Sequence, residues 1–359
     1  MRYEFDRIVI GGGAAGLFAA GWAAKSGLRV LVLEKRERPA RKILVTGKGR
    51  CNVTNDCDQE TLMANIPGNG RFLYSALTRF TPQDAMAFFE GLGVPLKVER
   101  GNRVFPVSDR SFDISGALER ELRRLHVRWV RDRAREITVQ DGHVTGVQGE
   151  KQHYPASAVV LATGADPRTL GVAGEAELLG RGVAYCAACD GMFYKGKTVV
   201  VVGGGNSAAA DALLLSRVAK KVILVHRRDT LRATKIYHEP LEQAENVEFR
   251  WNSTVSALLS GDRLTGVRLR DTVTGEESVV DCDGVFVSVG RQPATALAVG
   301  QLALDGGGYI VAGETTETSI PGVYAVGDVR TKPLRQVVTA VADGAVAVHM
   351  AEKYIAENR

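Results

Sequence analysis

Residues 6–16 read Asp-Arg-Ile-Val-Ile-Gly-Gly-Gly-Ala-Ala-Gly, and this stretch decides the fold of the first part of the chain. A short apolar strand ends at the glycine turn, a helical pattern follows over 17–26, and a second apolar strand covers 28–34. The spacing Gly-x-Gly-x-x-Gly lets backbone N–H groups approach a pyrophosphate at a helix N-terminus. The stretch therefore predicts a βαβ unit that binds a dinucleotide.

An acidic residue in the expected place strengthens this prediction. Glu34 ends the second strand, where its carboxylate can accept hydrogen bonds from a ribose diol. A glycine-rich turn without a ligand is the alternative. The residues expected at this first site are Gly11, Gly13, Ala14, Ala15, Gly16, Glu34 and Lys35.

A second unit of the same kind begins at residue 197. A buried strand leads into Gly203-Gly204-Gly205-Asn206-Ser207-Ala208, a helical pattern follows over 208–218, and the next strand covers 221–225. That strand ends in basic residues instead of an acid, and guanidinium groups bind a 2′-phosphate that an acid would repel. The sequence predicts NADP(H) here, with a solvated basic patch as the alternative. The residues expected at this site are Gly203, Gly205, Asn206, Ser207, Ala208, His226, Arg227, Arg228, Arg232, Gly290 and Arg291.

A Cys-x-x-Cys pair precedes the second turn, at Cys186 and Cys189, and Asp190 follows it directly. Such a pair is either a redox dithiol or half of a zinc site, and zinc needs two further ligands at matching spacing. The other cysteines are isolated and the six histidines are scattered, so no metal site is expected. Asp190 can donate or accept the proton that thiolate chemistry requires. A flavin would connect a nicotinamide with a dithiol, because it accepts hydride and passes electrons to disulfides.

The composition limits the remaining possibilities. The chain has 359 residues, is 45% hydrophobic and 24% charged, and carries a net charge of +5, which excludes disorder as its main state and does not favour nucleic-acid binding. No apolar run is long enough to cross a membrane. The first residues lead directly into a strand, which leaves no room for a secretory signal. Five sparse cysteines are typical of a reducing cytoplasm.

The order of the elements predicts the domain organisation. A strand over 322–326 and a helix over 336–356 can complete the first sheet, so the second unit would be inserted into a discontinuous first one. The predicted fold class is α/β, with two Rossmann-like dinucleotide-binding domains, the NADPH domain inserted into the FAD domain. The expected boundaries are 1–168, 169–286 and 287–359. Residues 39–60 are expected to form a loop, and helices are expected over 71–79, 82–92 and 111–126.

Residues from about 157 to 359 resemble the low-molecular-weight bacterial thioredoxin reductases. The matching stretches include 162–168, 182–191, 203–211, 226–229, 290–293, 327–329 and 335–340. The resemblance implies that Asp328 binds the flavin ribityl chain, that Arg335 and Gln336 lie by the isoalloxazine, and that the enzyme is a homodimer. It also implies that Cys189 faces the flavin and that Cys186 attacks an external disulfide. The flavin residues in this half are then Ala162, Thr163, Gly164, Gly327, Asp328, Arg335, Gln336 and Val337.

The first 150 residues are similar instead to BaiN-type flavoproteins beyond the opening fingerprint. Residues 42–55, 71–75 and 101–106 carry this resemblance, although the inserted β-rich domain of those proteins has no counterpart here. In that family the Gly-Arg-Cys-Asn loop wraps the FAD. The resemblance therefore adds Lys42, Gly49, Arg50, Cys51 and Asn52 to the expected flavin site.

Together these patterns predict an FAD- and NADPH-dependent disulfide reductase that acts on thioredoxin or a thioredoxin-like protein. One alternative is a BaiN-like flavin reductase of a small enone, with vestigial cysteines. A second is an NADPH oxidase or a reductase of a peroxiredoxin system. A third is a flavin-bound redox sensor without enzymatic activity.

Overall fold

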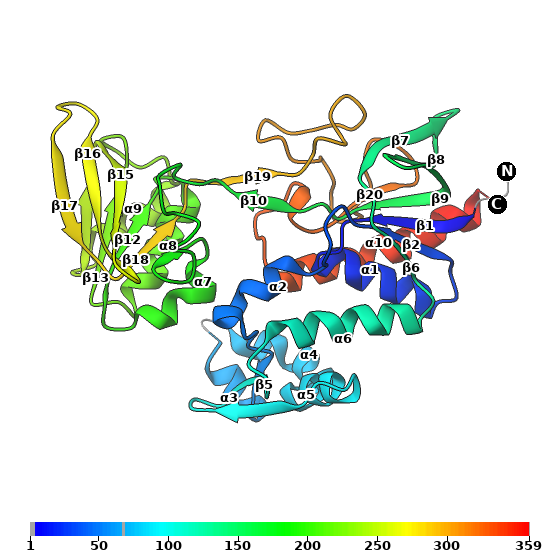
Figure 1. Ribbon diagram of the computed structural model, residues 1–359, viewed down its shortest axis with the longest axis horizontal. Helices are drawn as coiled ribbons and strands as arrows, with labels where there is room; N and C mark the ends of the chain where they lie inside the picture. The colour runs from blue at the N-terminus through cyan, green and yellow to red at the C-terminus, as the bar shows by residue number, and fades with distance from the viewer. Residues whose placement is uncertain (1–3, 67–68, 359) are drawn as a thin grey trace. The chain divides into compact units, whose positions relative to one another are not determined.

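The computed structural model describes residues 4–66 and 69–358 (Figure 1). The chain forms two compact units: unit 1 combines residues 1–165 with 293–359, and unit 2 is residues 166–292. The divisions fall at 165/166 and 292/293, where the sequence predicts 168/169 and 286/287. Unit 2 continues beyond residue 286 because the Ser288 N–H donates to the carbonyl oxygen of Val202 at 2.8 Å. The two connecting segments, β10 (Ala165–Pro167) and β19 (Arg291–Pro293), pair with each other.

The sheet of unit 1 is built around the first fingerprint strand. Its order is β6-β2-β1-β9-β8-β7, and β20 pairs with β9 in parallel, so the C-terminal segment does complete the sheet. The strands β6, β2, β1, β9 and β20 are parallel to one another, whereas β8 is antiparallel to β9 and to β7. The bounds are β1 Phe5–Ile10, β2 Val30–Leu33, β6 Arg128–Val130, β7 Ala134–Gln140, β8 His143–Gly149, β9 His153–Leu161 and β20 Val323–Ala325.

One face of this sheet is covered by helices. Figure 1 shows α1 (Ala14–Lys25), α6 (Ser111–Arg124) and α10 (Val337–Glu357) on the same side of the strands. Helices α1 and α10 approach closely because Gly344 has no side chain: a Cβ there would lie 2.8 Å from the Ala15 carbonyl oxygen. The short 3₁₀ turn η5 (Gly327–Val329) lies between β20 and α10. This packing brings η5 and the first half of α10 against the start of α1, beside the first glycine turn.

Residues 41–106 form an excursion from this sheet, and here the expected loop over 39–60 is wrong. The excursion contains α2 (Arg41–Val45) and η1 (Thr46–Gly49) before a small antiparallel sheet of order β3-β5-β4. Its first helix depends on tertiary contacts, since Ile43 packs on a cluster with Cys51, Ile114 and Ala117. The other bounds are β3 Thr54–Asn55, α3 Gln59–Ala64, η2 Gly70–Leu73, α4 Tyr74–Arg79, α5 Pro82–Gly91, β4 Leu96–Glu99 and β5 Arg103–Pro106.

Unit 2 is a parallel sheet of order β11-β18-β12-β13-β14, with α8 (Asn206–Ser216) on one face. An antiparallel sheet of β15, β16 and β17 packs on the other face. The strand bounds are β11 Val183–Ala184, β12 Thr198–Val202, β13 Lys221–Val225, β14 Val247–Arg250, β15 Ser253–Ser260, β16 Leu264–Asp271, β17 Glu277–Asp281 and β18 Gly284–Val287. The remaining helices are α7 Ala187–Asp190, η3 Gly191–Tyr194, η4 Lys235–Tyr237 and α9 His238–Glu242.

The predicted α/β fold class, with one parallel unit inserted into another, is confirmed. Within residues 4–66 and 69–358, none of the helices has the length and apolar character needed to cross a membrane.

Candidate functional site

The first glycine turn has the shape that a pyrophosphate requires. Gly11 has φ +108°, and a Cβ there would lie 2.6 Å from the carbonyl oxygen of Ala162 at the end of β9. A Cβ on Gly16 would lie 2.0 Å from the Gly11 carbonyl oxygen, whereas a Cβ on Gly13 would meet nothing within 4 Å. The turn is therefore closely packed on the protein side and open at Gly13. The first N–H groups of α1 have no partner within the helix and can bind an anion.

Glu34 supports the same turn from the end of β2. Its buried carboxylate accepts hydrogen bonds from the Gly12 N–H at 2.7 Å and from the Arg36 N–H at 2.9 Å, each on a different oxygen. A carboxylate oxygen has two lone pairs, so both oxygens can accept a further bond from a ribose hydroxyl. Glu34 thus fits its predicted role, while the neighbouring Lys35 is exposed.

The start of α10 gathers other predicted flavin residues. Lys42 forms an ion pair with Asp328 in η5, and the Arg335 guanidinium lies 3.9 Å from the centre of the Tyr309 ring. Gln336 caps α10, and Val337 is its exposed first residue. A Cβ on Gly327 would lie 3.1 Å from the Ala15 side chain, so η5 lies against α1 near the glycine turn.

A buried charge cluster beneath η5 was missed by the sequence analysis. The Asp343 carboxylate accepts hydrogen bonds from the Gly327 N–H at 2.8 Å, from the Arg330 guanidinium at 2.7 and 2.9 Å, and from the Lys332 amine at 2.6 Å. Burial alone would raise the pKa of Asp343, but these donors hold it below its usual value. The cluster fixes the backbone that presents Asp328. Its members lie in a helix and a loop that show no common motif, so no sequence signal identified it.

The Gly-Arg-Cys-Asn loop is held mainly by its own protein contacts. Arg50 pairs with Glu99 at 2.9 Å and Asp109 at 3.1 Å and lies over the Phe105 ring, and the Asn52 side-chain amide donates to backbone oxygens of β3 and β5. Cys51 has φ +60° and is buried, and burial raises the pKa of its thiol. These contacts show Arg50 and Asn52 in structural roles, and their contact with a flavin stays a prediction. Gly49, with φ +82°, lies in the same loop.

After β9, Ala162, Thr163 and Gly164 lead toward unit 2. The Ala162 carbonyl oxygen lies against Gly11, and the Thr163 hydroxyl donates to the Ala294 carbonyl oxygen at 2.8 Å. The segment thus borders the first glycine turn, as the sequence predicts. The Thr163 hydrogen bond also fixes Ala294, the residue directly after β19.

The second glycine turn repeats the geometry of the first. Gly203 has φ +148°, and a Cβ there would lie 2.4 Å from the Ser288 carbonyl oxygen. A Cβ on Gly205 would meet nothing within 4 Å, so this turn is also open where a pyrophosphate would approach. Asn206 and Ser207 begin α8 and are exposed, and the buried Ala208 packs under the turn.

His226 lies directly on this turn. A Cβ on Gly204 would be 2.2 Å from the imidazole Cε1 atom, and the ring is buried with no hydrogen-bond partner for Nε2. Burial lowers the pKa of His226, and the neighbouring guanidinium groups of Arg232, Arg228 and Arg227 lower it further. An imidazole nitrogen left without a partner beside an open glycine turn fits a nucleotide site.

The three arginines of the motif are exposed around the same turn. The Arg232 N–H donates to the Gly204 carbonyl oxygen at 2.7 Å, which holds the basic segment against the glycines. Within the part of the chain that the structure describes, Arg227, Arg228 and Arg232 form no ion pair with a carboxylate. Their positive charge is therefore available for a 2′-phosphate. Arg291, by contrast, lies in β19, and Gly290 accepts a backbone hydrogen bond from Arg168 at 3.0 Å.

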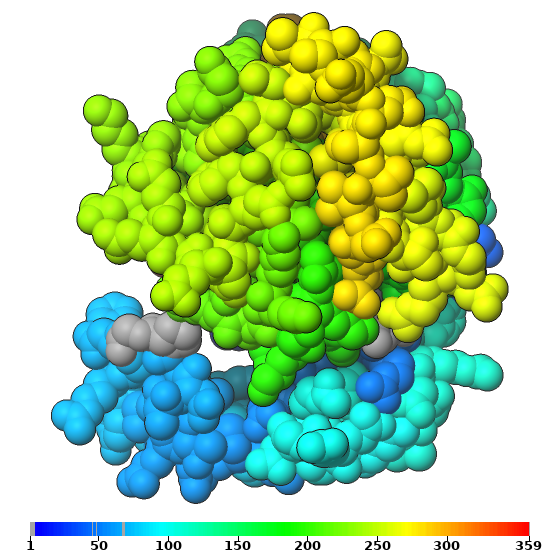
Figure 2. Space-filling view, turned by 90° about the vertical axis from the view of Figure 1, so that its left-hand side faces the viewer, coloured from blue at the N-terminus to red at the C-terminus, as the bar shows by residue number. Residues whose placement is uncertain are grey.

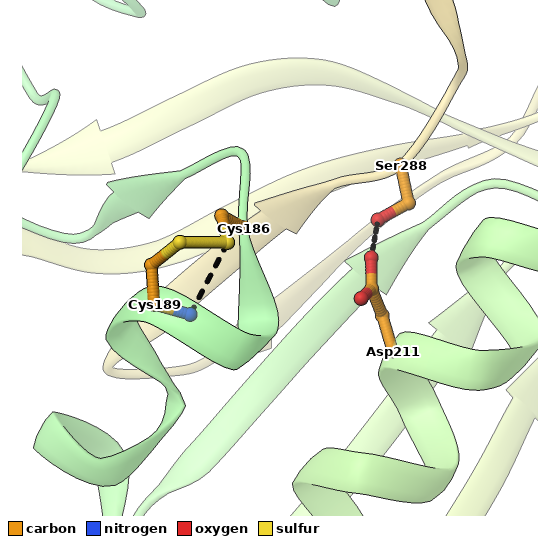
Figure 3. Close-up of a disulfide and its surroundings, with 4 residues drawn as sticks. All are labelled: Cys186, Cys189, Asp211 and Ser288. Atoms are coloured by element: carbon orange, nitrogen blue, oxygen red, sulfur yellow. Dashed lines mark hydrogen bonds between the residues drawn. A yellow bond between two sulfur atoms is a disulfide. The ribbon is translucent and has the colours of Figure 1, made fainter. Parts of the chain in front are cut away.

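Cys186 and Cys189 form a disulfide, with Cα atoms 5.3 Å apart (Figure 3). The pair begins α7, directly after the short strand β11, and the Asp190 N–H donates to the Cys186 carbonyl oxygen at 3.1 Å. The two sulfurs are bonded to each other, which fits the predicted redox pair. A buried carboxylate, Glu175, accepts hydrogen bonds from the Tyr185 hydroxyl at 2.6 Å and from two backbone N–H groups, which fixes the residue before Cys186. The sequence analysis did not single out this contact.

A family model described as pyridine nucleotide-disulphide oxidoreductase matches residues 5–344. The chain belongs to this family. The predicted cofactors of the oxidoreductase, FAD and NADPH, are confirmed by this membership, and both glycine turns fit a dinucleotide.

Proteins of similar sequence match this oxidoreductase over both halves of its chain. It is 34% identical over 357 residues to a thioredoxin reductase of Treponema pallidum, covering 99% of this chain and 98% of that protein. It is 46% identical over 205 residues to a thioredoxin reductase of Listeria monocytogenes, covering 57% and 64% of the two chains. The crystal structure of a thioredoxin reductase from Streptococcus pyogenes superposes with a TM-score of 0.74 at 32% identity, covering 98% of both chains.

The predicted resemblance to low-molecular-weight bacterial thioredoxin reductases is therefore confirmed. The first of these relatives extends the likeness over the first 150 residues as well, the part that the sequence analysis compared with BaiN-type flavoproteins.

Proposed function

We propose that this oxidoreductase transfers two electrons from NADPH to a disulfide of thioredoxin, or of a thioredoxin-like protein, through the Cys186–Cys189 pair. The relatives named above support this substrate. The observation that carries the proposal is the position of the disulfide, in the same unit as the basic glycine turn and ahead of β12. NADPH, one proton and the substrate disulfide are consumed, and NADP⁺ and the substrate dithiol are formed.

The residues of each site are part of the proposal. In unit 1 the turn at 11–16 would hold the FAD pyrophosphate, Glu34 a ribose, and Asp328 the ribityl chain. In unit 2 the turn at 203–208 would hold the NADPH pyrophosphate, with Arg227, Arg228 and Arg232 at the 2′-phosphate. When bound, the two cofactors supply hydride and two-electron transfer to the Cys186–Cys189 disulfide.

The chain's own thiols and acid carry out the last exchange. The Cys186 thiolate attacks the substrate disulfide and forms a mixed disulfide, and one substrate sulfur leaves as a thiolate that takes a proton from Asp190. Cys189 then attacks Cys186, which releases the second substrate thiol and restores the disulfide. The sulfur of Cys189 is also the one that would receive electrons from the flavin.

We further propose that the enzyme is a homodimer of the cytoplasm. The remaining cysteines, Cys51, Cys57 and Cys282, carry free thiols, which is typical of a reducing compartment. Light scattering on the purified enzyme tests the oligomeric state, and fractionation of the native cell tests the location.

The deciding experiment is turnover of a disulfide dye with NADPH, with and without a panel of thioredoxins. We expect dye reduction that requires a thioredoxin and both cysteines. Reduction of a small enone that survives Cys186→Ser would instead identify a BaiN-like reductase. Transfer only to oxygen or to a peroxiredoxin-system carrier would identify the second alternative, and absence of NADPH turnover would identify a sensor.

A further inference from the structure

A hydrogen-bonded pair between the nucleotide turn and the disulfide has no role in the mechanism above. The Ser288 hydroxyl, just after β18, donates to Asp211 Oδ2 in α8 at 2.5 Å. Figure 3 draws this pair in the surroundings of the Cys186–Cys189 disulfide. Both residues belong to unit 2, so the arrangement does not depend on unit 1.

The backbone fixes this pair against the second glycine turn. The Ser288 N–H donates to the Val202 carbonyl oxygen at 2.8 Å, and the Ser288 carbonyl oxygen occupies the space beside Gly203 that a Cβ would need. Asp211 is half-buried, and the Ser288 hydroxyl bonds its Oδ2 atom, which leaves Oδ1 without a donor among the described residues. Burial raises the pKa of Asp211, although the Ser288 hydroxyl and the charge of Arg291 lower it. The free oxygen is thus a partly desolvated acceptor next to the turn.

The strand order shows which part of a dinucleotide reaches this acceptor. The carboxyl ends of β13, β12, β18 and β11 follow one another along one edge of the sheet. The 2′-phosphate cluster follows β13 and the pyrophosphate turn follows β12. A dinucleotide that crosses this edge extends its other half beyond β12, toward the end of β18. Ser288 follows that end and holds Asp211 of α8 beside it, and the next strand, β11, leads to Cys186.

We propose that Asp211, held in place by Ser288, accepts a hydrogen bond from the nicotinamide riboside half of NADPH. The donor is the carboxamide N–H of the nicotinamide ring, which NADPH and NADH share, so Asp211 anchors the nicotinamide end without selecting between them. The arginines after β13 select the phosphate instead. This inference rests on the proposed NADPH site of unit 2.

The test compares two ligands that differ only in the nicotinamide half. Calorimetric titration of the FAD-loaded enzyme would use NADP⁺ and 2′-phospho-ADP-ribose, which lacks the nicotinamide ring. For Asp211→Ala we expect the affinity for NADP⁺ to fall about tenfold, the loss of one hydrogen bond to a charged group, while the affinity for phospho-ADP-ribose stays within about twofold. Ser288→Ala should reduce the affinity for NADP⁺ by a smaller factor. Asp262→Asn, in the exposed turn between β15 and β16, is the matched control and should change neither affinity.

The two ligands also separate this inference from the proposed function. If the parent enzyme binds neither ligand, the proposed NADPH site is wrong. If the parent binds both and Asp211→Ala weakens both equally, or weakens neither, the role of Asp211 at the nicotinamide end is wrong. Asp211→Leu keeps approximately the size of the side chain, has no acceptor oxygen, and replaces Asp211→Ala where that variant does not fold. A thermal melt of each variant identifies such a case, and the same two-ligand comparison then decides.

Discussion

Lys42 in α2 forms an ion pair with Asp328 in η5, although 286 positions separate the two residues in the chain. The pair joins the excursion of unit 1 to the loop before α10, and therefore connects the two sequence segments that make up this unit. The Lys42 side chain is 60% exposed and that of Asp328 is 13% exposed. An ion pair with so exposed a member contributes little to folding, so its value lies in orienting Asp328.

Replacing Lys42 should therefore affect flavin binding more than folding. For Lys42→Met we expect weaker retention of FAD, and a free energy of unfolding of the apoprotein that changes by less than about 1 kcal/mol. Fluorescence titration of apoprotein with FAD and urea unfolding measure the two quantities. Lys353→Met, in the exposed pair with Glu357 on α10, is the control and should retain FAD normally. An unchanged FAD affinity in Lys42→Met would show that the ion pair does not orient Asp328.

The disulfide should carry the second half of the reaction and not the first. We expect Cys186→Ser and Cys189→Ser each to abolish thioredoxin reduction, because each variant lacks one of the two sulfurs needed for exchange. NADPH should still bleach the visible absorbance of the bound flavin in both variants. Anaerobic stopped-flow absorbance and a thioredoxin assay measure the two half-reactions. Cys282→Ser, at a buried free thiol, is the control for thioredoxin reduction. Thioredoxin reduction that persists in either variant would show that the electrons do not pass through the Cys186–Cys189 pair.

The basic segment after β13 should make NADPH the preferred nucleotide. A guanidinium contact with a phosphate contributes about 1.5–3 kcal/mol, which is roughly tenfold to a hundredfold in affinity. Replacing both Arg227 and Arg228 by Gln should therefore lower kcat/KM for NADPH strongly and for NADH little. Arg270→Gln, at an exposed arginine of β16, should change neither value. Equal efficiency of the parent enzyme with both nucleotides would show that these arginines do not recognise the phosphate.

The two fingerprint units could be predicted from the sequence because their signals are local. A glycine turn between an apolar strand and a helix constrains the backbone within a few residues, and Gly11 and Gly203 both have the positive φ that the motif requires. The insertion of unit 2 followed from the same logic, since the first sheet needed a further strand. The helix α2 could not be predicted, because it depends on the packing of Ile43 against Cys51 and α6.

Contacts between distant residues explain what else the sequence analysis missed. Ser288 and Asp211 are 77 positions apart, and the pair exists only because β18 lies beside β12. Asp343 acquires its partners when α10 packs under η5, and neither a helix pattern nor a charge count identifies such a cluster. Arg50 shows the reverse case: its motif suggests a cofactor contact, while the folded chain pairs it with Glu99 and Asp109.

The Asp343 cluster should be important for the stability of unit 1. Removing the carboxylate leaves the buried cations Arg330 and Lys332 without a counter-charge, so Asp343→Ala should lower the free energy of unfolding by about 3–5 kcal/mol. Because the pKa of Asp343 is lowered in the folded protein, its contribution is present above the unfolded carboxyl pKa, near 3.9, and is lost as pH falls through the folded value. Urea unfolding at pH 7 and at successively lower pH measures both effects. Glu357→Gln, at the exposed end of α10, is the control, and an equally stable Asp343→Ala would contradict this role.

Arg7 should be the opposite case, a buried charge whose removal does not weaken the protein. It lies in the middle of β1 with a fully buried side chain, and its three guanidinium nitrogens have no hydrogen-bond partner among the described residues. The nearest carboxylate oxygen, Oε1 of Glu352 in α10, is 3.7 Å away, which is too far for a hydrogen bond. Burial lowers the pKa of Arg7 to about 10, and the charge of Glu352 offsets only part of this effect.

Methionine has a similar length and no charge to desolvate, so Arg7→Met should be neutral or should raise the free energy of unfolding by about 1–4 kcal/mol. Glu352→Gln should instead destabilise the protein, because it leaves the cation without its counter-charge.

The sign of the pH dependence follows from the pKa of Arg7: a buried cation whose folded pKa lies below its unfolded value of 12.5 costs stability while it is charged. The parent protein should therefore gain stability, relative to Arg7→Met, as pH rises above about 10. Urea unfolding of the parent and both variants at pH 8 and at about pH 10.5 measures this, and an Arg7→Met variant that is clearly less stable at pH 8 would show that the guanidinium is satisfied in solution.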